Sequence, residues 1–203
     1  MIPRIEQKLE LSNSDYLVLL KWLRDKKAET IYPERKIVSR YFDTMDLKMF
    51  YDTKEGIVPR KKLRIRTYET DNFLSSNNPY NLEVKMTTEN KRYKSIEKNI
   101  DLYNRINKGI FDKQYGLCFE TVDVSYYRQY YLVDGCRVTI DRGLEYKLVG
   151  IYSGKLMSNL EDNNIVLEIK AGIETNLTFI ANNFEFPRSR FSKYERAIDL
   201  LLG

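Results

Sequence analysis

Charged side chains recur at every second position in several segments of this sequence, and apolar residues fill the positions between them. In a β-strand, residues i and i+2 point to the same face. Each segment would therefore carry its charges on one face and its apolar side chains on the other. The segments are R-I-E-Q-K at 4–8, L-R-I-R at 63–66, L-E-V-K at 82–85, R-V-T-I-D at 137–141 and L-E-I-K at 167–170. Guanidinium and ammonium groups in this density suit the oxygens of a polyanion.

The positions on the charged face of these segments carry more basic than acidic residues. The basic ones, including one in a long tyrosine-rich segment, are Arg4, Lys8, Arg64, Arg66, Lys85, Arg128, Arg137 and Lys170; the acidic ones are Glu6, Glu83, Asp141 and Glu168. A sheet with a merely charged outer face is the simpler explanation for any single strand. If the face instead lines the lumen of a barrel, uncompensated buried charge is too costly. Such a lumen must then hold water and a polyanion, with the carboxylates holding a divalent metal against it.

Composition narrows the chemistry further. The 203 residues include 34 Lys and Arg, 29 Asp and Glu, and no histidine. Histidine-dependent triads, dyads and HExxH zinc sites are therefore excluded. Cys118 and Cys136 are too few for a disulfide scaffold, and we expect both to be reduced core residues. The net charge of +5 is weak evidence for an anionic partner.

Alternating and helical periodicities predict the elements that carry these residues. Helices are expected at Ser12–Lys27, capped by Ser12 or Ser14, at Asp46–Thr53, within Leu102–Lys113 and at Ser192–Leu202. Strands are expected at Arg4–Leu11, Lys36–Asp43, Lys61–Glu69, Tyr80–Thr87, Tyr93–Ile100, Thr121–Val133, Cys136–Asp141 and Ile165–Lys170. Pro33 is expected to break the chain path, and Asp134-Gly135 to form a tight hairpin turn.

These elements favour one α+β domain over residues 1–203. We expect about eight or nine mostly antiparallel strands, and the amphipathic helices at Ser12–Lys27 and Ser192–Leu202 could cover their apolar side. The N-terminal residues are too charged for a signal peptide, and apolar runs are too short for a membrane span. The expected location is the cytoplasm. Nucleic-acid binding is disfavoured, because the cations lie on strand faces and no aromatic RNA-binding motif is visible.

The ordered motifs resemble those of the VTC domain, the polyphosphate-polymerase domain of the vacuolar transporter chaperone family. That domain is grouped with the CYTH-like triphosphate tunnel metalloenzymes. Besides the segments above, the matching motifs are S-R-Y-F-D-T at 39–44, Y-Y-R-Q-Y-Y at 126–131 and R-F-S-K-Y at 190–194. One departure is that Arg4 stands where the wider CYTH pattern has a first glutamate. A lost carboxylate and an added cation favour holding a longer polyphosphate over metal-rich hydrolysis.

The resemblance implies a closed or nearly closed antiparallel β-barrel of about eight strands, with helices packed outside. It also implies that basic residues in the tunnel of this barrel bind phosphates and that carboxylates bind Mn²⁺ or Mg²⁺. The implied catalytic cations are Lys8, Arg64, Arg66, Lys85, Arg128 and Arg137; the further substrate-binding cations are Arg4, Lys94, Lys170, Arg190 and Lys193. Lys91 or Arg92 is an alternative to Lys94. Glu168 is the main implied metal ligand. Glu6 and Glu83 either join it or orient the neighbouring cations.

Three functions remain open at this point. The leading one is a metal-dependent phosphotransferase that moves the γ-phosphate of ATP to a growing polyphosphate chain. The second is a tunnel-type hydrolase of inorganic triphosphate or a nucleoside triphosphate. The third is a module that binds polyphosphate, triphosphate or phosphate without turnover.

Overall fold

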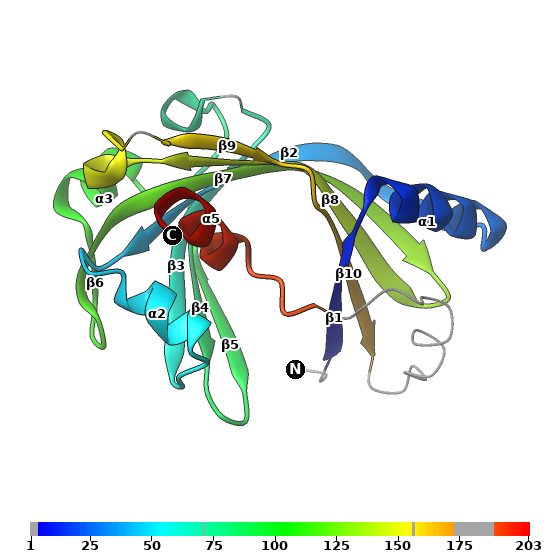
Figure 1. Cartoon of the computed structure of the whole chain (residues 1–203), viewed down its shortest axis with the longest axis horizontal. Helices are drawn as coiled ribbons and strands as arrows, with labels where there is room; N and C mark the ends of the chain where they lie inside the picture. Colours follow the sequence, from blue (N-terminus) through cyan, green and yellow to red (C-terminus); the bar gives the residue numbers. More distant parts are fainter. Residues whose placement is uncertain (1–3, 71, 156, 173–188) are drawn as a thin grey trace. The chain divides into compact units, whose positions relative to one another are not determined.

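The computed structural model describes residues 4–70, 72–155, 157–172 and 189–203, with positions 4, 5 and 75 described in the backbone only (Figure 1). The N-terminal elements are β1 (Arg4–Leu11), α1 (Asn13–Asp25), β2 (Glu29–Asp43), α2 (Lys48–Lys54), β3 (Arg60–Tyr68), β4 (Asn81–Thr87) and β5 (Arg92–Glu97). The remaining elements are α3 (Leu102–Lys108), β6 (Ile110–Asp112), β7 (Gly116–Val133), β8 (Cys136–Leu148), β9 (Asn159–Asp162), β10 (Ile165–Gly172) and α5 (Lys193–Leu202).

The chain divides into two compact units. The first contains the described residues of 1–35, 126–144 and 162–191, and the second contains those of 36–125, 145–161 and 192–203. Strands β2, β7 and β8 each contribute residues to both units. The expectation of a single domain over residues 1–203 stays a prediction.

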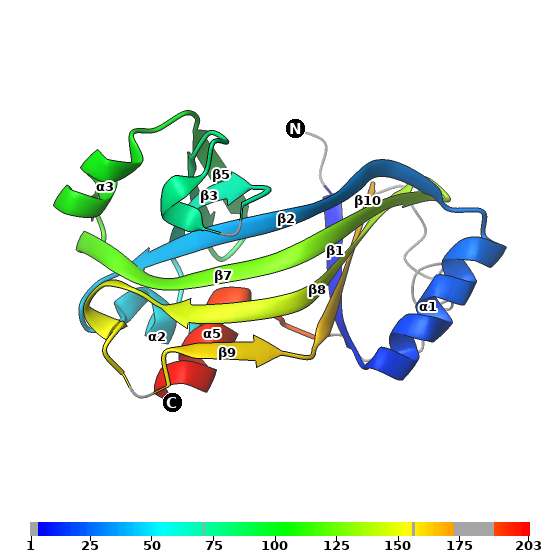
Figure 2. The ribbon, with the colours of Figure 1, turned by 90° about the horizontal axis from the view of Figure 1, so that it is seen from above.

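The sheet is antiparallel in every strand pair whose register is given, so the α+β class is confirmed. Its strand order is β1-β10-β8-β7-β2-β3-β4-β5, with β6 beside β7 and β9 beside β8 (Figure 2). The path ends at β1 and at β5, and hydrogen bonds between the described strands do not close it. The expected closed barrel is therefore not confirmed.

In the first unit, the apolar face of β1, β10 and β8 is covered by α1. Leu9, Leu167 and Ile140 join one buried cluster with Leu19 and Leu23 of the helix. The helix begins at the expected cap, because the Ser12 hydroxyl accepts from the Asp15 amide while the Asp15 carboxylate accepts from the Ser12 amide. The apolar side chains of these strands therefore face a helix, as the alternating pattern predicted.

In the second unit, the apolar face of β3 and β4 lies against other elements. Leu63, Ile65 and Leu82 form a buried cluster with Met49 of α2 and Leu102 of α3. Val84 packs against the same cluster. Both expected cysteines are free and buried, and Cys118 belongs to this core while Cys136 belongs to that of the first unit.

The buried carboxylate of Asp43 joins three elements of the second unit. It lies at the end of β2 and accepts backbone N–H groups of Thr44, Met49 and Phe50 at 2.7–2.9 Å. Its Oδ2 atom, which accepts from Phe50, also accepts from the Tyr194 hydroxyl of α5 at 2.5 Å. The start of α2 and the C-terminal helix are thus tied to the same strand.

Pro33 does not break the chain path as expected, because β2 continues through it. The β2–β3 ladder covers only Ile37–Phe42, so Pro33 lies beyond it. The missing proline N–H therefore removes no hydrogen bond from that ladder.

The other boundaries shift by a few residues, and two short strands were not expected. β6 lies within the segment predicted as a helical connector, and β9 follows a loop with no strand signal. β8 extends seven residues beyond the expected end at Asp141, to Leu148. Among the described residues, no helix is both long and apolar enough to cross a membrane.

The turn between β7 and β8 provides a test of the hairpin. Asp134 and Gly135 have φ angles of 47° and 73°, as the Asp-Gly pair predicted. Gly135→Ala should destabilise the protein by about 1 kcal/mol, because an L side chain disfavours this conformation. A Cβ there meets no atom within 4 Å, so the cost is that of the backbone alone. Chemical denaturation measures it, with Gly154→Ala as the control at a glycine that also has open space. Equal stabilities of the two variants would contradict the prediction.

Candidate functional site

In the second unit, the polar face of β3, β4 and β5 gathers several predicted site residues. Strand register places Arg64 opposite both Tyr41 and Glu83, and Arg66 opposite both Ser39 and Asn81. Lys85 lies opposite both Lys62 and Lys94. Because directly opposed residues share a face, this side of the sheet carries a dense group of cations around one carboxylate.

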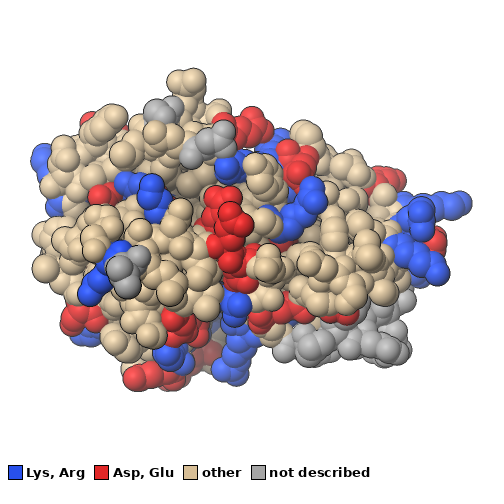
Figure 3. All heavy atoms as spheres, turned by 45° about the horizontal axis from the view of Figure 1, so that its top comes forward, with Lys and Arg blue, Asp and Glu red and all other residues tan. Residues whose placement is uncertain are grey.

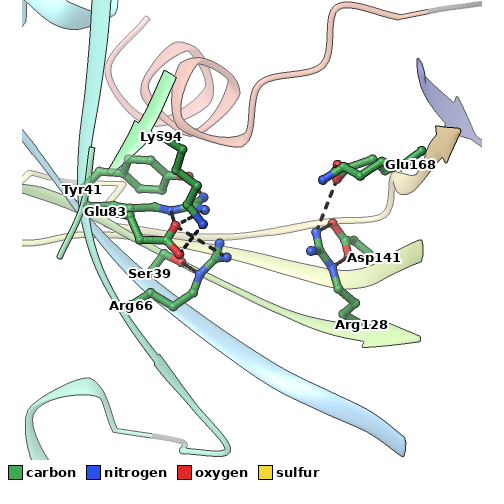
Figure 4. Close-up of polar contacts among 10 residues, drawn as sticks. Ser39, Tyr41, Arg66, Glu83, Lys94, Arg128, Asp141 and Glu168 are labelled. Carbon is green, nitrogen blue, oxygen red and sulfur yellow. Dashed lines mark hydrogen bonds and ion pairs between the residues drawn. The ribbon is translucent and has the colours of Figure 1, made fainter. Parts of the chain in front are cut away.

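Glu83 is the centre of an ion-pair network on this face (Figure 4). Its Oε2 accepts from Arg64 Nε at 2.8 Å and from Arg64 Nη2 at 2.5 Å, and lies 3.9 Å from Arg66 Nη1. Its Oε1 accepts from Lys94 Nζ at 2.8 Å. Arg66 Nε in turn donates to the Ser39 hydroxyl at 3.0 Å.

The charge of Glu83 is stabilised by these neighbours. Burial alone would raise the pKa of the carboxyl, but Arg64, Arg66 and Lys94 outweigh it and lower the pKa from 4.5 to about 2. Both of its oxygens already accept from cations. This arrangement favours the orienting role that the sequence left open for Glu83 over a role as metal ligand.

Tyr41 supports the same guanidinium from the neighbouring strand. Its buried hydroxyl accepts from Arg64 Nη1 at 3.0 Å. Its ring stacks on that of Tyr194, with centroids 5.0 Å apart and planes 20° from parallel. Tyr194 is itself held by Asp43. A continuous series of contacts therefore connects the C-terminal helix to Arg64.

Lys193 and Lys85 are less enclosed members of this unit. Lys193 is the first residue of α5 and is half-buried, next to the Ser192 cap. The Ser192 hydroxyl accepts from Lys62 Nζ at 2.6 Å, so a lysine of β3 lies at the start of this helix. Lys85 is exposed.

In the first unit, a second group of predicted residues shares the polar face of β1, β10 and β8. Glu6 lies opposite Lys170, and Lys8 opposite Glu168. Lys170 Nζ is 2.6 Å from Glu168 Oε1 and 3.9 Å from Glu6 Oε2. Lys8 Nζ lies 3.7 Å from Glu6 Oε1 and donates to the Phe191 carbonyl. Here the positive and negative charges alternate between neighbours.

Arg128 joins this group from β7. Its Nη2 donates to Asp141 Oδ2 at 2.7 Å and lies 3.8 Å from Glu168 Oε2 (Figure 4). Burial alone would raise the pKa of Glu168, but Lys170, Arg128 and Lys8 lower it well below its usual range. Glu168 is therefore ionised throughout the physiological range.

The remaining predicted site residues of this unit are Arg137, Arg190 and Arg4. Arg137 lies opposite Lys170 in register but is exposed. Arg190 is also exposed. Arg4 lies in β1, and its side chain falls outside what the structure describes.

The carboxylates offer a partial fit to a divalent metal. The described part of the chain contains no group of three or more His, Cys, Asp or Glu side chains placed to hold one. Mg²⁺ is, however, commonly bound through one or two carboxylates together with substrate phosphates. Glu6 and Glu168 already share a cation, the ammonium of Lys170. Their oxygens therefore suit a metal that takes its other ligands from phosphate.

One buried charge network was missed at the level of sequence. Arg40 is 6% exposed and donates from Nε and Nη2 to Asp123, both at 2.7 Å, and from Nη1 to Glu120 at 2.8 Å. Its guanidinium lies 4.4 Å from the centroid of the Phe73 ring. The sequence did contain a sign of this network, because Arg40 lies on the same strand face as the apolar residues Val38 and Phe42.

Another surface feature does not suit phosphate. A hollow of about 330 Å³ is lined by Glu145, Asn159, Leu160 and Glu161. Figure 3 shows one face of the molecule, with acidic side chains gathered near its middle. Two carboxylates in the lining of the hollow would repel an anion, so the cation-bearing sheet faces are the better candidates.

The fold is shared with solved structures over nearly the whole chain. A proposed adenylate cyclase from Vibrio parahaemolyticus matches with a TM-score of 0.54 and 12% identity, covering 97% of both chains. A conserved hypothetical protein from Pyrococcus furiosus gives 0.55 and 14%, covering 95% of this chain and 99% of its own. A Hippeastrum protein, described as a proposed adenylyl cyclase with a dominant triphosphatase activity, gives 0.57 and 16%, covering 98% and 97%.

The family follows from the sequence comparison. The VTC domain model matches residues 3–116, so this chain belongs to the VTC domain family. That match includes Glu6, Lys8, Arg64, Arg66 and Glu83. No curated protein matches the chain. The resemblance seen in the motifs is thereby confirmed.

Glu83→Gln tests the ion-pair network through its pH dependence. The folded-state pKa lies below the ordinary value, so this carboxylate stabilises the fold fully above about pH 4.5. That contribution is lost as the pH falls toward 2. The substitution should lower the free energy of unfolding at pH 7 by about 3 kcal/mol and flatten its pH dependence in this window.

Urea unfolding between pH 2 and pH 7 measures both effects. Glu97→Gln is the matched control, because Glu97 lies on the neighbouring edge strand β5 and makes a more exposed ion pair with Arg105 of α3. The control should change stability by less than about 1 kcal/mol. An unaltered pH profile in Glu83→Gln would refute the assigned role of the network.

Proposed function

We propose that this protein is a polyphosphate polymerase that transfers the γ-phosphate of ATP to the end of a growing polyphosphate chain. The observation that carries the proposal is the cation-rich face around Arg64 and Arg66 in a member of the VTC domain family. Only one carboxylate, Glu83, lies among the cations that β3, β4 and β5 place there. Such a face favours a ligand with several negative charges.

The two guanidinium groups are suited to hold phosphate oxygens in a defined orientation. Arg64 is fixed on one side by Glu83 and on another by Tyr41, and Arg66 is fixed by Ser39. Guanidinium donates hydrogen bonds in pairs with planar geometry, so a pre-oriented group loses little freedom on binding. A bound phosphate would therefore meet donors that are already in place.

Phosphoryl transfer requires mainly positioning and charge neutralisation. An ionised terminal oxygen of polyphosphate attacks the γ-phosphorus of ATP, forming a new P–O bond. The bond from that phosphorus to the β–γ bridging oxygen breaks, and ADP leaves with the electron pair. The attacking oxygen is already anionic near pH 7, so no histidine or other dedicated base is needed. The lack of histidine is consistent with this chemistry.

Glu168 and Glu6 are the residues we assign to Mn²⁺ or Mg²⁺. When bound, the metal would neutralise charge on the phosphate oxygens. Lys170 currently neutralises both carboxylates, and its ammonium would have to withdraw from them. Lys8 and Arg128 limit the repulsion between these carboxylates and an incoming phosphate.

Hydrolysis of triphosphate is the second candidate function. The triphosphatase activity described for the Hippeastrum protein favours it, since that protein has the same fold. Water would replace the chain end as the attacking group. The two functions differ in their products, so one incubation distinguishes them.

The role of the arginines is tested by binding. Arg64→Ala together with Arg66→Ala should weaken triphosphate binding at least tenfold, because charge-assisted hydrogen bonds contribute roughly 1.5–3 kcal/mol each. Isothermal calorimetry measures the affinity, and thermal unfolding establishes that the variant is folded. Arg66→Ala alone leaves the Arg64–Glu83 pair in place and provides a second variant. Unchanged affinity in both would remove these arginines from the site.

The reaction itself is tested with ATP and Mn²⁺. A polymerase should yield ADP and polyphosphate, whereas a hydrolase should yield ADP and free phosphate. Glu168→Gln should lower turnover at least a hundredfold, equivalent to about 2.7 kcal/mol of transition-state stabilisation. Metal-free triphosphate binding should persist in this variant, because a negative charge has been removed.

Each outcome of this experiment has a separate meaning. If Glu168→Gln keeps its metal-dependent turnover, Glu168 is a counter-ion and the metal is held elsewhere. If the wild-type protein binds triphosphate but converts no ATP, the chain is a binding module and the polymerase proposal fails.

A further inference from the structure

The polar face of β3, β4 and β5 continues beyond Arg64 and Arg66 in two more rows of cations. Strand register places Lys62, Lys85 and Lys94 in one row, and Arg60, Thr87 and Arg92 in the next. We call these two the outer rows. The face thus carries seven basic residues and one acidic residue: Arg60, Lys62, Arg64, Arg66, Lys85, Arg92 and Lys94, with Glu83.

The opposite face of the same strands is balanced. Its charged residues are paired across to other elements: Lys61 Nζ lies 2.8 Å from Asp112 Oδ2, and Glu97 Oε1 lies 2.7 Å from Arg105 Nη2. The positive excess is therefore confined to one side of the strands. A surface charged merely for solubility would not require this segregation.

The outer rows are accessible, and Lys94 is the member that pairs with Glu83. Lys85, Arg92 and Lys94 are exposed, and Arg60 and Lys62 are half-buried. Arg60 Nη1 donates to the Gly56 and Ile57 carbonyls, and Lys62 donates to a hydroxyl. These hydrogen bonds orient the two side chains. No strand position in the outer rows holds a carboxylate.

The spacing of the rows matches an extended ligand. Alternate residues of a strand lie about 6.7 Å apart, so the four rows from Arg66 to Arg60 extend over roughly 20 Å. A triphosphate held by Arg64 and Arg66 would leave the outer rows largely uncovered. A linear chain of many phosphates could contact all of them.

We propose that the outer rows bind the distal part of a polyphosphate chain and so make this face selective for chains longer than triphosphate. This inference rests on the proposed function for the identity of the ligand. It assigns new roles to Arg60 and Lys62, and it gives Arg92 a role beside Lys94 instead of in its place. The rows add affinity only once the chain is long enough to reach them, so binding strengthens as the chain grows.

A single-stranded nucleic acid is a less suitable ligand for this face. Such binding normally combines cations with exposed aromatic rings on which bases stack. The outer rows contain cations and one threonine, and no aromatic residue. Their chemistry fits bare phosphate better than a base-bearing strand.

Arg60→Gln with Arg92→Gln tests the proposal by direct binding. Wild-type protein should bind long-chain polyphosphate at least tenfold more tightly than tripolyphosphate. The double variant should lose about tenfold in affinity for the long chain, with triphosphate affinity unchanged. Its affinity should also depend less steeply on salt, because fewer cations contact the ligand. Arg92→Gln alone should give a smaller loss of affinity for the long chain. This variant leaves the hydrogen bonds from Arg60 to the Gly56 and Ile57 carbonyls intact.

The control removes the same charge from α3. Arg105→Gln with Lys108→Gln should change neither affinity, since Arg105 pairs with Glu97 on the opposite face. Equal affinity of the wild-type protein for both chain lengths would overturn the proposal. So would equal losses for the control and the test variant, or a single-stranded DNA that binds as tightly as polyphosphate. These measurements need no turnover, so they remain decisive if the polymerase activity is absent.

Discussion

The second unit depends on one buried carboxylate. Asp43 ends β2, accepts the backbone N–H groups at the start of α2, and accepts from Tyr194 of α5. A buried carboxylate is costly unless it is well hydrogen-bonded, so these donors must stay in place for the unit to remain folded. Tyr194 then stacks on Tyr41, which accepts from Arg64. The geometry of Arg64 is thereby set by the packing of helix α5.

Repulsion between like charges in the same unit opposes its folding. Arg64 and Arg66 are 9% and 6% exposed, and they lie on one face with Lys94. Glu83 relieves their repulsion in the absence of ligand, and this is reflected in its low pKa. A phosphate at the same face would add to that compensation. Under the proposed function, the interactions that stabilise the fold would also bind the ligand, as expected where a site is pre-organised. The first unit differs, because its cations and carboxylates alternate between neighbouring positions.

Sequence periodicity predicted which face of each strand carries charge, but not how the charges pair. The apolar residues of β3 and β10 lie in buried cores, as expected, and Ser12, one of the two predicted caps of the first helix, does cap it. Contacts between distant segments were not: Asp43 with Tyr194, and Arg40 with Asp123, are 151 and 83 residues apart. Closure of the sheet was inferred from a family resemblance. Hydrogen bonding is a property of pairs of strands, and the described strands do not close it.

The edge strand β5 gives the cationic face a second consequence. All six of its residues are exposed, and an edge strand presents unpaired backbone groups that another strand can join. Two copies aligned edge to edge would bring Arg92 and Lys94 of each close together, so like-charge repulsion discourages self-association. A polyanion that neutralised these residues would remove that protection. Colloidal stability of the protein would then decline wherever such a polyanion accumulated.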